Sequence, residues 1–198
     1  MLNYNKDSLT NLISLINESC RFANSNFGDS NGINLSKSIQ FVTSDEDFNS
    51  MLISYLNYLN NEFIVSANFI EISKCGLRAR IKERNSIYIK LKHYKERELK
   101  KGSLSLNRCL NDLMGFRVII NGLLMNQDEV KSTLDYLHEQ KIIWRWYLRE
   151  DGLYKGYHCY FKVDNLSFPW ELQLWDSDWE DNNIKDHKRH ENEKYVSI

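Results

Sequence analysis

The chain has 198 residues, of which 42% are hydrophobic and 27% charged, as is typical of one folded domain with its own core. A net charge of −1 and a single proline, Pro169, exclude a uniformly basic chain and long proline-rich linkers. The four cysteines form no C-x-x-C pair, which argues against a zinc ribbon and indicates free thiols in a reducing compartment. The sequence shows neither a signal peptide nor an apolar run of membrane-spanning length, so we expect a cytoplasmic protein without a membrane partner.

The charge is distributed very unevenly along the chain. Residues 74 to 108 contain 12 Lys or Arg and 3 Glu, a net charge of +9, which leaves −10 for all other residues. Such a distribution predicts one strongly basic surface on an otherwise acidic protein. A surface of this kind attracts phosphate, either of a nucleotide or of a nucleic acid.

The first 70 residues read as mostly helical. Residues 8 to 24 place apolar side chains at helical spacing, with Ser8 as the N-cap. A second helix is expected from about Asp45, with Ser44 as its cap and acidic residues in its first turn. We expect the helical segment 1–70 to pack on the same domain as a core formed by residues 71–198.

The rest of the chain alternates between strand and helix patterns. Strands are expected over 75–83, 116–120, 142–150, 156–163 and 169–175, and helices over 85–102, 126–141 and 178–195. The "DGLYKG" segment reads as the turn between the third and fourth strands. This order predicts an α+β (α/β mixed) domain built on a mixed sheet of about five strands flanked by helices.

The basic window contains a candidate phosphate site. Arg80 and Lys82 are two residues apart on a strand and therefore share a face, and Ser86 and Lys90 share a face of the next helix. Cationic side chains beside a helix start suit a polyphosphate. The same residues are equally typical of a basic helix that only faces water.

A second group of polar residues lies on the later strands. Asp112 stands just before an apolar strand, and Arg117 lies within it, where a charge requires a partner. Glu171 and Gln173 alternate with apolar residues on the last strand. Asp112 also suits a turn and the last strand an ordinary amphipathic strand, but the two acids are positioned to share a Mg²⁺ with substrate phosphates.

Four short motifs, in this order, resemble the synthetase domain of the RelA/SpoT family, the pyrophosphokinases that make (p)ppGpp alarmones. They are "RIKERNSIYIK", "DLMGFR", "GYHCYFK" and "ELQLW", within residues 78 to 190. The resemblance implies a nucleotidyltransferase-like synthetase fold and an ATP-dependent pyrophosphokinase. It also implies Mg²⁺ as cofactor and ATP as pyrophosphate donor.

The resemblance assigns a role to each matching residue. Arg80 and Arg117 would sandwich the adenine of ATP, and its phosphates would be bound by Lys82, Ser86 and Lys90. The catalytic residues would be Asp112 and Glu171 as Mg²⁺ ligands, Tyr157 stacked on the acceptor base, and Gln173 orienting Glu171 or the acceptor. Glu171 is also a candidate for helping to deprotonate the acceptor hydroxyl.

The departures from the family pattern bear on the acceptor. The family usually carries His four residues after the loop tyrosine, where this chain has Phe161, and His158 follows Tyr157 directly. The usual Gln-Ile-Arg-Thr is Gln-Leu-Trp-Asp here, residues 173 to 176. The loop, the last strand and the pair Asn183 and His187 are most similar to the toxic small members of toxin–antitoxin systems.

This similarity implies a toxin that transfers pyrophosphate from ATP to the 3′-hydroxyl of the tRNA CCA end and inhibits translation, with a cognate antitoxin protein as partner. The acceptor end would contact Tyr157, His158, Lys155, Arg149, Lys92 and Lys95. One alternative is a small alarmone synthetase that uses a guanosine or adenosine nucleotide as acceptor. A further alternative is a non-catalytic RNA-binding module.

Overall fold

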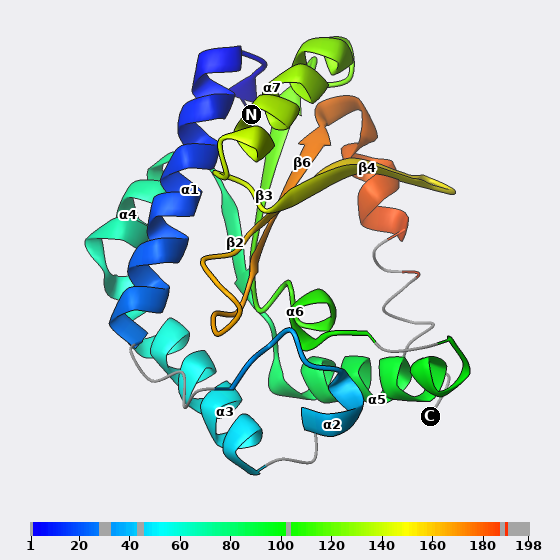
Figure 1. Ribbon diagram of the computed structural model, residues 1–198. Helices are drawn as coiled ribbons and strands as arrows, with labels where there is room; N and C mark the ends of the chain where they lie inside the picture. The colour runs from blue at the N-terminus through cyan, green and yellow to red at the C-terminus, as the bar shows by residue number, and fades with distance from the viewer. Residues whose placement is uncertain (1, 28–32, 43–45, 102–103, 187–188, 190–198) are drawn as a thin grey trace.

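The computed structural model describes residues 2–27, 33–42, 46–101, 104–186 and 189 (Figure 1). The N-terminal part contains β1 (Leu2–Asn3), α1 (Lys6–Phe27), α2 (Ile39–Val42), α3 (Glu46–Asn61), the 3-10 helix η1 (Phe63–Val65) and α4 (Ala67–Lys74). It is followed by β2 (Arg78–Ile81), α5 (Arg84–Lys101), α6 (Leu106–Cys109), β3 (Met114–Asn121) and α7 (Gln127–Glu139). The last elements are β4 (Arg145–Asp151), β5 (Tyr154–Phe161), β6 (Trp170–Asp176) and the 3-10 helix η2 (Ser177–Trp179), after which residues 180–186 are helical.

The strands form one mixed sheet in the order β1-β3-β6-β5-β4, with β2 also paired to β3. β3 runs parallel to β1 and β6, whereas β2–β3, β6–β5 and β5–β4 are antiparallel pairs. The predicted α+β architecture with a mixed sheet flanked by helices is therefore confirmed. β1 was not predicted, because two residues are too few to show a period-2 pattern.

The two faces of the sheet differ in chemistry because side chains alternate along each strand. One face is apolar and buried, with Phe116 and Val118 of β3, Leu172 and Leu174 of β6 and Cys159 of β5. Helices α1, α4 and α7 cover this side in Figure 1, and α1 contacts β5 directly. The opposite face carries the polar residues of the same strands, and Figure 1 shows the helical residues after η2 on that side.

The N-terminal helices contribute to the same core as the sheet. In α1 the spacing of Leu9, Leu12, Ile13 and Ile16 produces an apolar stripe, and all four side chains are buried. Tyr55 of α3 accepts a hydrogen bond from the Trp170 indole at 2.7 Å. Among the described residues no helix is long and apolar enough to span a membrane.

Candidate active site

A cleft of about 320 Å³ opens on the polar face of the sheet where β2, β3 and β6 lie side by side. Five of the residues singled out in the sequence line it, namely Arg80, Asp112, Arg117, Glu171 and Gln173. The remaining lining residues are Arg78, Ala79, Gly115, Phe116 and Ile184. The cleft therefore joins both of the polar groups that were predicted separately from the sequence.

Strand register explains why these residues meet. In the antiparallel pair β2–β3, Arg78 lies opposite Arg117 and Arg80 opposite Gly115. In the parallel pair β3–β6, Gly115 lies beside Glu171 and Arg117 beside Gln173. Paired residues of neighbouring strands share a face of the sheet, so all of these side chains project toward the same cleft.

Asp112 forms the centre of a buried ionic group at one end of the cleft. Its Oδ2 accepts from Lys82 Nζ at 2.5 Å and its Oδ1 from Lys90 Nζ at 3.0 Å. Burial alone would raise the pKa of Asp112, but the two ammonium groups outweigh burial and hold that pKa well below its usual range. Three groups with two positive charges and one negative charge carry a net charge of +1, which suits a phosphate.

The two lysines respond to this environment in opposite directions. Burial lowers the pKa of Lys82, and the repulsion from Lys90 adds to that effect. Burial also acts to lower the pKa of Lys90, but the attraction and hydrogen bond of Asp112 outweigh it and raise that pKa. Lys90 is consequently the more firmly charged of the two.

Glu171 accepts hydrogen bonds from three side chains. His158 Nδ1 lies 2.9 Å and the Tyr160 hydroxyl 2.7 Å from Oε1, and Gln173 Nε2 lies 3.0 Å from Oε2. Burial acts to raise the pKa of Glu171, but the hydrogen bond from His158, its charge and the bond from Tyr160 lower it below the usual value. Glu171 is thus a buried carboxylate that stays ionised.

The direction of these hydrogen bonds follows from the donors present. The Trp175 indole can only donate, and it donates to the Tyr154 hydroxyl at 2.9 Å. That hydroxyl also lies 2.7 Å from His158 Nε2. Because an ionised carboxylate can only accept, His158 Nδ1 carries a hydrogen and donates it to Glu171.

Arg117 links Gln173, the donor to Glu171, to the ring of Trp175. Its Nε and Nη2 donate to Gln173 Oε1 at 3.1 and 3.0 Å, and its guanidinium lies 3.6 Å from the ring centroid of Trp175. Burial lowers the pKa of Arg117 to about 10. One face of Arg117 is covered by Trp175, so a base would stack on its other face, while Arg80 is exposed and free to approach the same cleft.

The structure contradicts the stacking role of Tyr157. This residue is fully buried on the face of the sheet that the helices cover, and its hydroxyl has no hydrogen-bond partner within the described part of the chain. The reason is register, because Tyr157 pairs with Leu174 of β6, whose side chain belongs to the buried apolar face. The residues of β5 on the face of Glu171 are therefore Tyr154, Gly156, His158 and Tyr160.

Two of these β5 residues are also connected to each other. Tyr154 and His158 are four residues apart and joined by a hydrogen bond of 2.7 Å. The period-2 alternation of the sequence, extended back through the presumed turn, would have revealed Tyr154. The same reasoning would have revealed Tyr160, as well as Trp175 on β6.

The other predicted acceptor residues are not gathered around the cleft. Lys155 pairs with Glu150 at 2.5 Å, and Arg149 pairs with Asp151 at 3.0 Å. Lys92 is exposed and follows Lys90 by two residues, which places it about 200° around the helix axis from Lys90. Lys95 and Ser86 are half-buried on α5, and neither lines the cleft.

Asn183 has a structural role. Its Oδ1 accepts from the Lys155 amide and its Nδ2 donates to the Lys155 carbonyl, both at 2.8 Å, as a neighbouring strand would do. The Asn183 side chain thus provides the hydrogen bonds that the Lys155 backbone lacks, because pairing between β5 and β6 covers only Tyr157–Phe161. His187, its predicted companion, lies outside the described residues.

Asp112 and Glu171 are the residues that would hold a magnesium ion together with substrate phosphates. Among the described residues no three His, Cys, Asp or Glu side chains form a group that could hold a metal. Mg²⁺, however, commonly binds one or two carboxylates and completes its octahedron with water and phosphate oxygens. Asp112 and Glu171 line one cleft, and within the described ranges Gln173 is the one donor to Glu171 Oε2, which leaves lone pairs available there.

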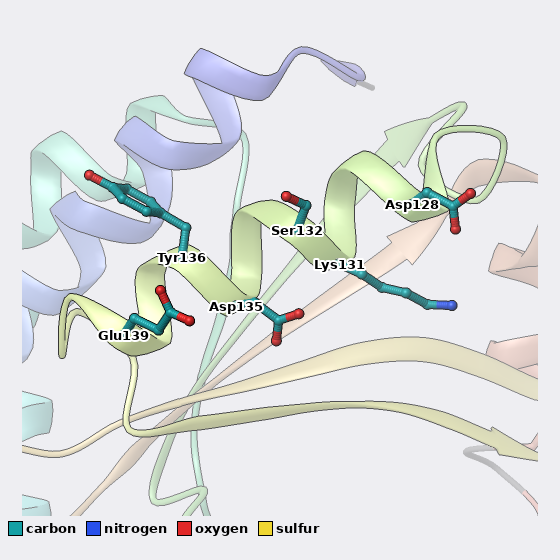
Figure 2. A pocket seen from close by; sticks show the side chains of 6 residues that line it. All are labelled: Asp128, Lys131, Ser132, Asp135, Tyr136 and Glu139. Atoms are coloured by element: carbon teal, nitrogen blue, oxygen red, sulfur yellow. The ribbon is translucent and has the colours of Figure 1, made fainter.

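A second hollow, of about 460 Å³, lies along the outer side of α7 (Figure 2). All six residues that line it belong to that one helix, and they are Asp128, Lys131, Ser132, Asp135, Tyr136 and Glu139. It contains no converging groups from a second element. The cleft on the sheet, rather than this hollow, is the candidate active site.

Solved structures that are similar to this chain include that of a small alarmone synthetase. No protein-family model and no curated protein matches the sequence. The small alarmone synthetase 1 from Bacillus subtilis is similar at 15% sequence identity, with a TM-score of 0.38, over 78% of this chain and 82% of that chain. Values this low do not show a shared family, so the function is inferred from the site and the sequence motifs.

Proposed function

We propose that the protein is an ATP-dependent pyrophosphokinase that transfers pyrophosphate to a ribose 3′-hydroxyl. One observation supports this most directly. Two ionised carboxylates, Asp112 and Glu171, line one cleft together with the guanidinium groups of Arg80 and Arg117. Phosphoryl transfer depends mainly on charge neutralisation and alignment, and both requirements are met by such a set of fixed charges.

The donor side of the cleft would hold ATP. Lys82 and Lys90, anchored by Asp112, present ammonium groups to the triphosphate, and Arg80 is free to meet either the phosphates or the adenine. Arg117, already stacked on Trp175, offers its second face to the base. Asp112 and Glu171 would hold Mg²⁺, which when bound neutralises phosphate charge.

The reaction moves one diphosphate group. The acceptor 3′-oxygen forms a bond to the β-phosphorus of ATP, and the bond between that phosphorus and the oxygen of the α-phosphate breaks. AMP leaves with the bonding electron pair, and the acceptor hydroxyl loses its proton to water. Glu171, held as an ionised carboxylate by its three donors, contributes negative charge next to the reacting hydroxyl.

The proposed acceptor is the 3′ end of tRNA, which would make the protein a translation-inhibiting toxin with an antitoxin partner. Arg145 and Lys162 each lie over the ring of Trp144, outside the cleft, at 5.2 and 4.6 Å. Cations interleaved with aromatic rings suit a single-stranded end better than one nucleotide. A free nucleotide is the second candidate, because a cleft of about 320 Å³ is of nucleotide size.

A transfer assay tests the proposal. ATP labelled in its γ-phosphate is incubated with the protein and Mg²⁺, with intact tRNA, tRNA trimmed of its CCA end, or GDP, GTP, ADP and AMP as acceptors. We expect label on intact tRNA and none on the trimmed form. Label only on a nucleotide would assign alarmone synthesis, and no label on any acceptor would favour the non-catalytic RNA-binding module.

A further inference from the structure

The edge strand β4 extends the polar face of the sheet beyond Glu171. Arg145, Tyr147 and Arg149 alternate along it and lie opposite Tyr160, His158 and Gly156 of β5. These β5 residues are on the face of Glu171, so the three β4 side chains are on that face too. Neither the cleft nor the proposed catalytic step accounts for them.

Tyr147 presents a flat aromatic surface to solvent. Its ring is parallel to the His158 ring within 2°, with centroids 5.2 Å apart, and 40% of the residue is exposed. Within the described sheet β4 has a strand neighbour on one side only. The ring therefore has one side against His158 and the other side available to a ligand.

Tyr147 is also connected to the candidate catalytic carboxylate. Its hydroxyl lies 3.1 Å from that of Tyr160, which donates to Glu171 Oε1. Because Tyr160 uses its only hydrogen on Glu171, Tyr147 is the donor to Tyr160. A base stacked on Tyr147 is thus two hydrogen bonds away from the carboxylate, and its ribose would lie between them.

Arg145 adds an incomplete cationic site next to this ring. Its guanidinium lies 4.3 Å from the ring centroid of Tyr160 and 5.2 Å from that of Trp144. Its Nε is buried and makes no hydrogen bond to the described part of the protein. The guanidinium forms no hydrogen bond or ion pair with the described residues, so its charge is available to a phosphate of a ligand.

We propose that β4 is the binding surface for a single-stranded RNA 3′ end, with the terminal base stacked on Tyr147 and its 5′-phosphate on Arg145. The preceding nucleotide lies toward Trp144 and Lys162, which extend the surface to the sheet edge. The identity of this RNA as the acceptor rests on the proposed function. A mononucleotide would use Tyr147 and Arg145 and leave Trp144 and Lys162 without a role.

Binding is measured apart from catalysis to test this surface. A short fluorescent oligoribonucleotide ending in CCA is titrated with the protein, without ATP, and its anisotropy is followed for wild type, Tyr147→Ala, Tyr147→Phe and Trp144→Ala. Stacking on aromatic rings suggests about a tenfold weaker Kd for Tyr147→Ala. Tyr147→Phe retains the ring and should bind within about twofold of wild type.

Controls separate this surface from general damage. Tyr136→Ala removes a more exposed tyrosine, on α7, and should leave Kd unchanged. Thermal melting identifies any variant that is not folded. If Tyr147→Ala is not folded, the Kd of Tyr147→Phe is compared with that of wild type instead. A second titration uses labelled ADP and shows whether the surface prefers a strand or a free nucleotide. Trp144→Ala should weaken binding of the oligonucleotide but not binding of ADP.

Two outcomes would overturn the proposal. One is an unchanged Kd for folded Tyr147→Ala, and the other is ADP binding as tightly as the oligonucleotide with no effect of Trp144→Ala on either. Failure of the proposed function gives a different pattern. In that case no label is transferred to tRNA, yet the oligonucleotide still binds in a Tyr147-dependent manner.

Discussion

At the scale of single residues, the environment of Glu171 defines what it can contribute. A general base near neutral pH works best with a pKa near the working pH, whereas the donors around Glu171 move its pKa in the opposite direction. Its pKa therefore lies below the usual value, and the carboxylate is ionised at neutral pH. This favours Glu171 as the residue that holds a cation and fixes the acceptor hydroxyl over its expected part in deprotonating it.

Glu171→Gln tests that charge. The amide has nearly the same shape but no negative charge, so we expect the transfer rate constant to fall by about a hundredfold or more. The melting temperature should fall by only a few degrees, because the amide oxygen still accepts from His158 and Tyr160. Glu139→Gln, on the exposed end of α7, is the matched control and should retain full activity. Activity of Glu171→Gln within a few-fold of wild type would disprove the assignment.

The substitution Gly156→Ala tests the packing of Trp175 beside the hydrogen bonds around Glu171. A Cβ at Gly156 would lie 2.9 Å from Trp175 Cδ1 and 3.3 Å from the Leu174 carbonyl oxygen. Gly156→Ala must therefore displace the Trp175 ring, which stacks on Arg117 and donates to Tyr154. We expect a loss of about 1–3 kcal/mol in unfolding free energy, together with a change in tryptophan fluorescence.

Gly115→Ala is the matched control for stability. Its nearest neighbour to the new Cβ would be the Arg80 carbonyl oxygen at 3.8 Å, an ordinary contact. Denaturant unfolding of both variants gives the comparison. Equal unfolding free energies of the two variants would show that the Trp175 ring moves without loss of stability. The close approach at Gly156 would then be unimportant.

At the scale of elements, the Lys82–Asp112–Lys90 group joins three parts of the chain. Lys82 precedes α5, Lys90 lies within it, and Asp112 precedes β3, so one carboxylate fixes helix to sheet. Asp112→Asn leaves two buried ammonium groups without a counter-charge. We expect it to lower the unfolding free energy by about 3 kcal/mol, measured by urea unfolding at neutral pH.

The pH dependence has a definite sign. The folded-state pKa of Asp112 is depressed, so its contribution to stability is complete above the unfolded value near 4 and is lost as the pH falls below that value. Asp112→Asn should lose less stability than wild type between about pH 4 and 2. Glu71→Gln, which breaks an exposed pair with Lys74, should stay within about 0.5 kcal/mol of wild type. A similar small loss for Asp112→Asn would contradict the anchoring role.

The elements themselves were largely predictable from the sequence, and the error in β5 shows the limit. Period-2 alternation identified β3 and β6 because their apolar residues form one continuous face. In β5 a glycine at each end of "GLYKG" suggested a long turn, whereas only Gly152, with φ of 59°, is in a turn conformation. The expected start at Gly156 left Tyr154 outside the strand, and the side of the sheet to which Tyr157 belongs is decided by its pairing with Leu174.

At the scale of the whole molecule, the site depends on strand order, which no local pattern contains. Arg117 and Gln173 are 56 residues apart in sequence yet hydrogen-bonded, because β6 inserts between β3 and β5. For Asp112 and Glu171 the strand patterns suggested a shared Mg²⁺, and the resemblance to a family implied the same pairing. Tyr147 lies outside the motifs, and Trp175 ends "ELQLW" but received no role from it, so the positions of both emerge only when β4, β5 and β6 are seen side by side.

The uneven charge of the chain leads to a prediction about acceptor size. Lys92 and Lys95 lie on sides of α5 that point away from Asp112, too far around the helix to meet a short strand in the cleft. A whole tRNA extends beyond the sheet, and we propose that its acceptor arm passes along α5. Replacing both lysines by alanine should then weaken tRNA binding and reduce its dependence on salt, but leave a short CCA-ended strand unaffected.

The slope of log K against log salt concentration measures this directly, since each neutralised phosphate contributes about 0.7 to 0.9 to that slope. We expect the slope for tRNA to become less steep by about 1.5 in the double variant and the slope for the short strand to stay constant. Lys131→Ala with Lys141→Ala, on and just after α7, removes the same charge from another side and should change neither slope. Equal tRNA slopes in all three proteins would mean that the α5 cations only face water and that the acceptor is held by the sheet alone.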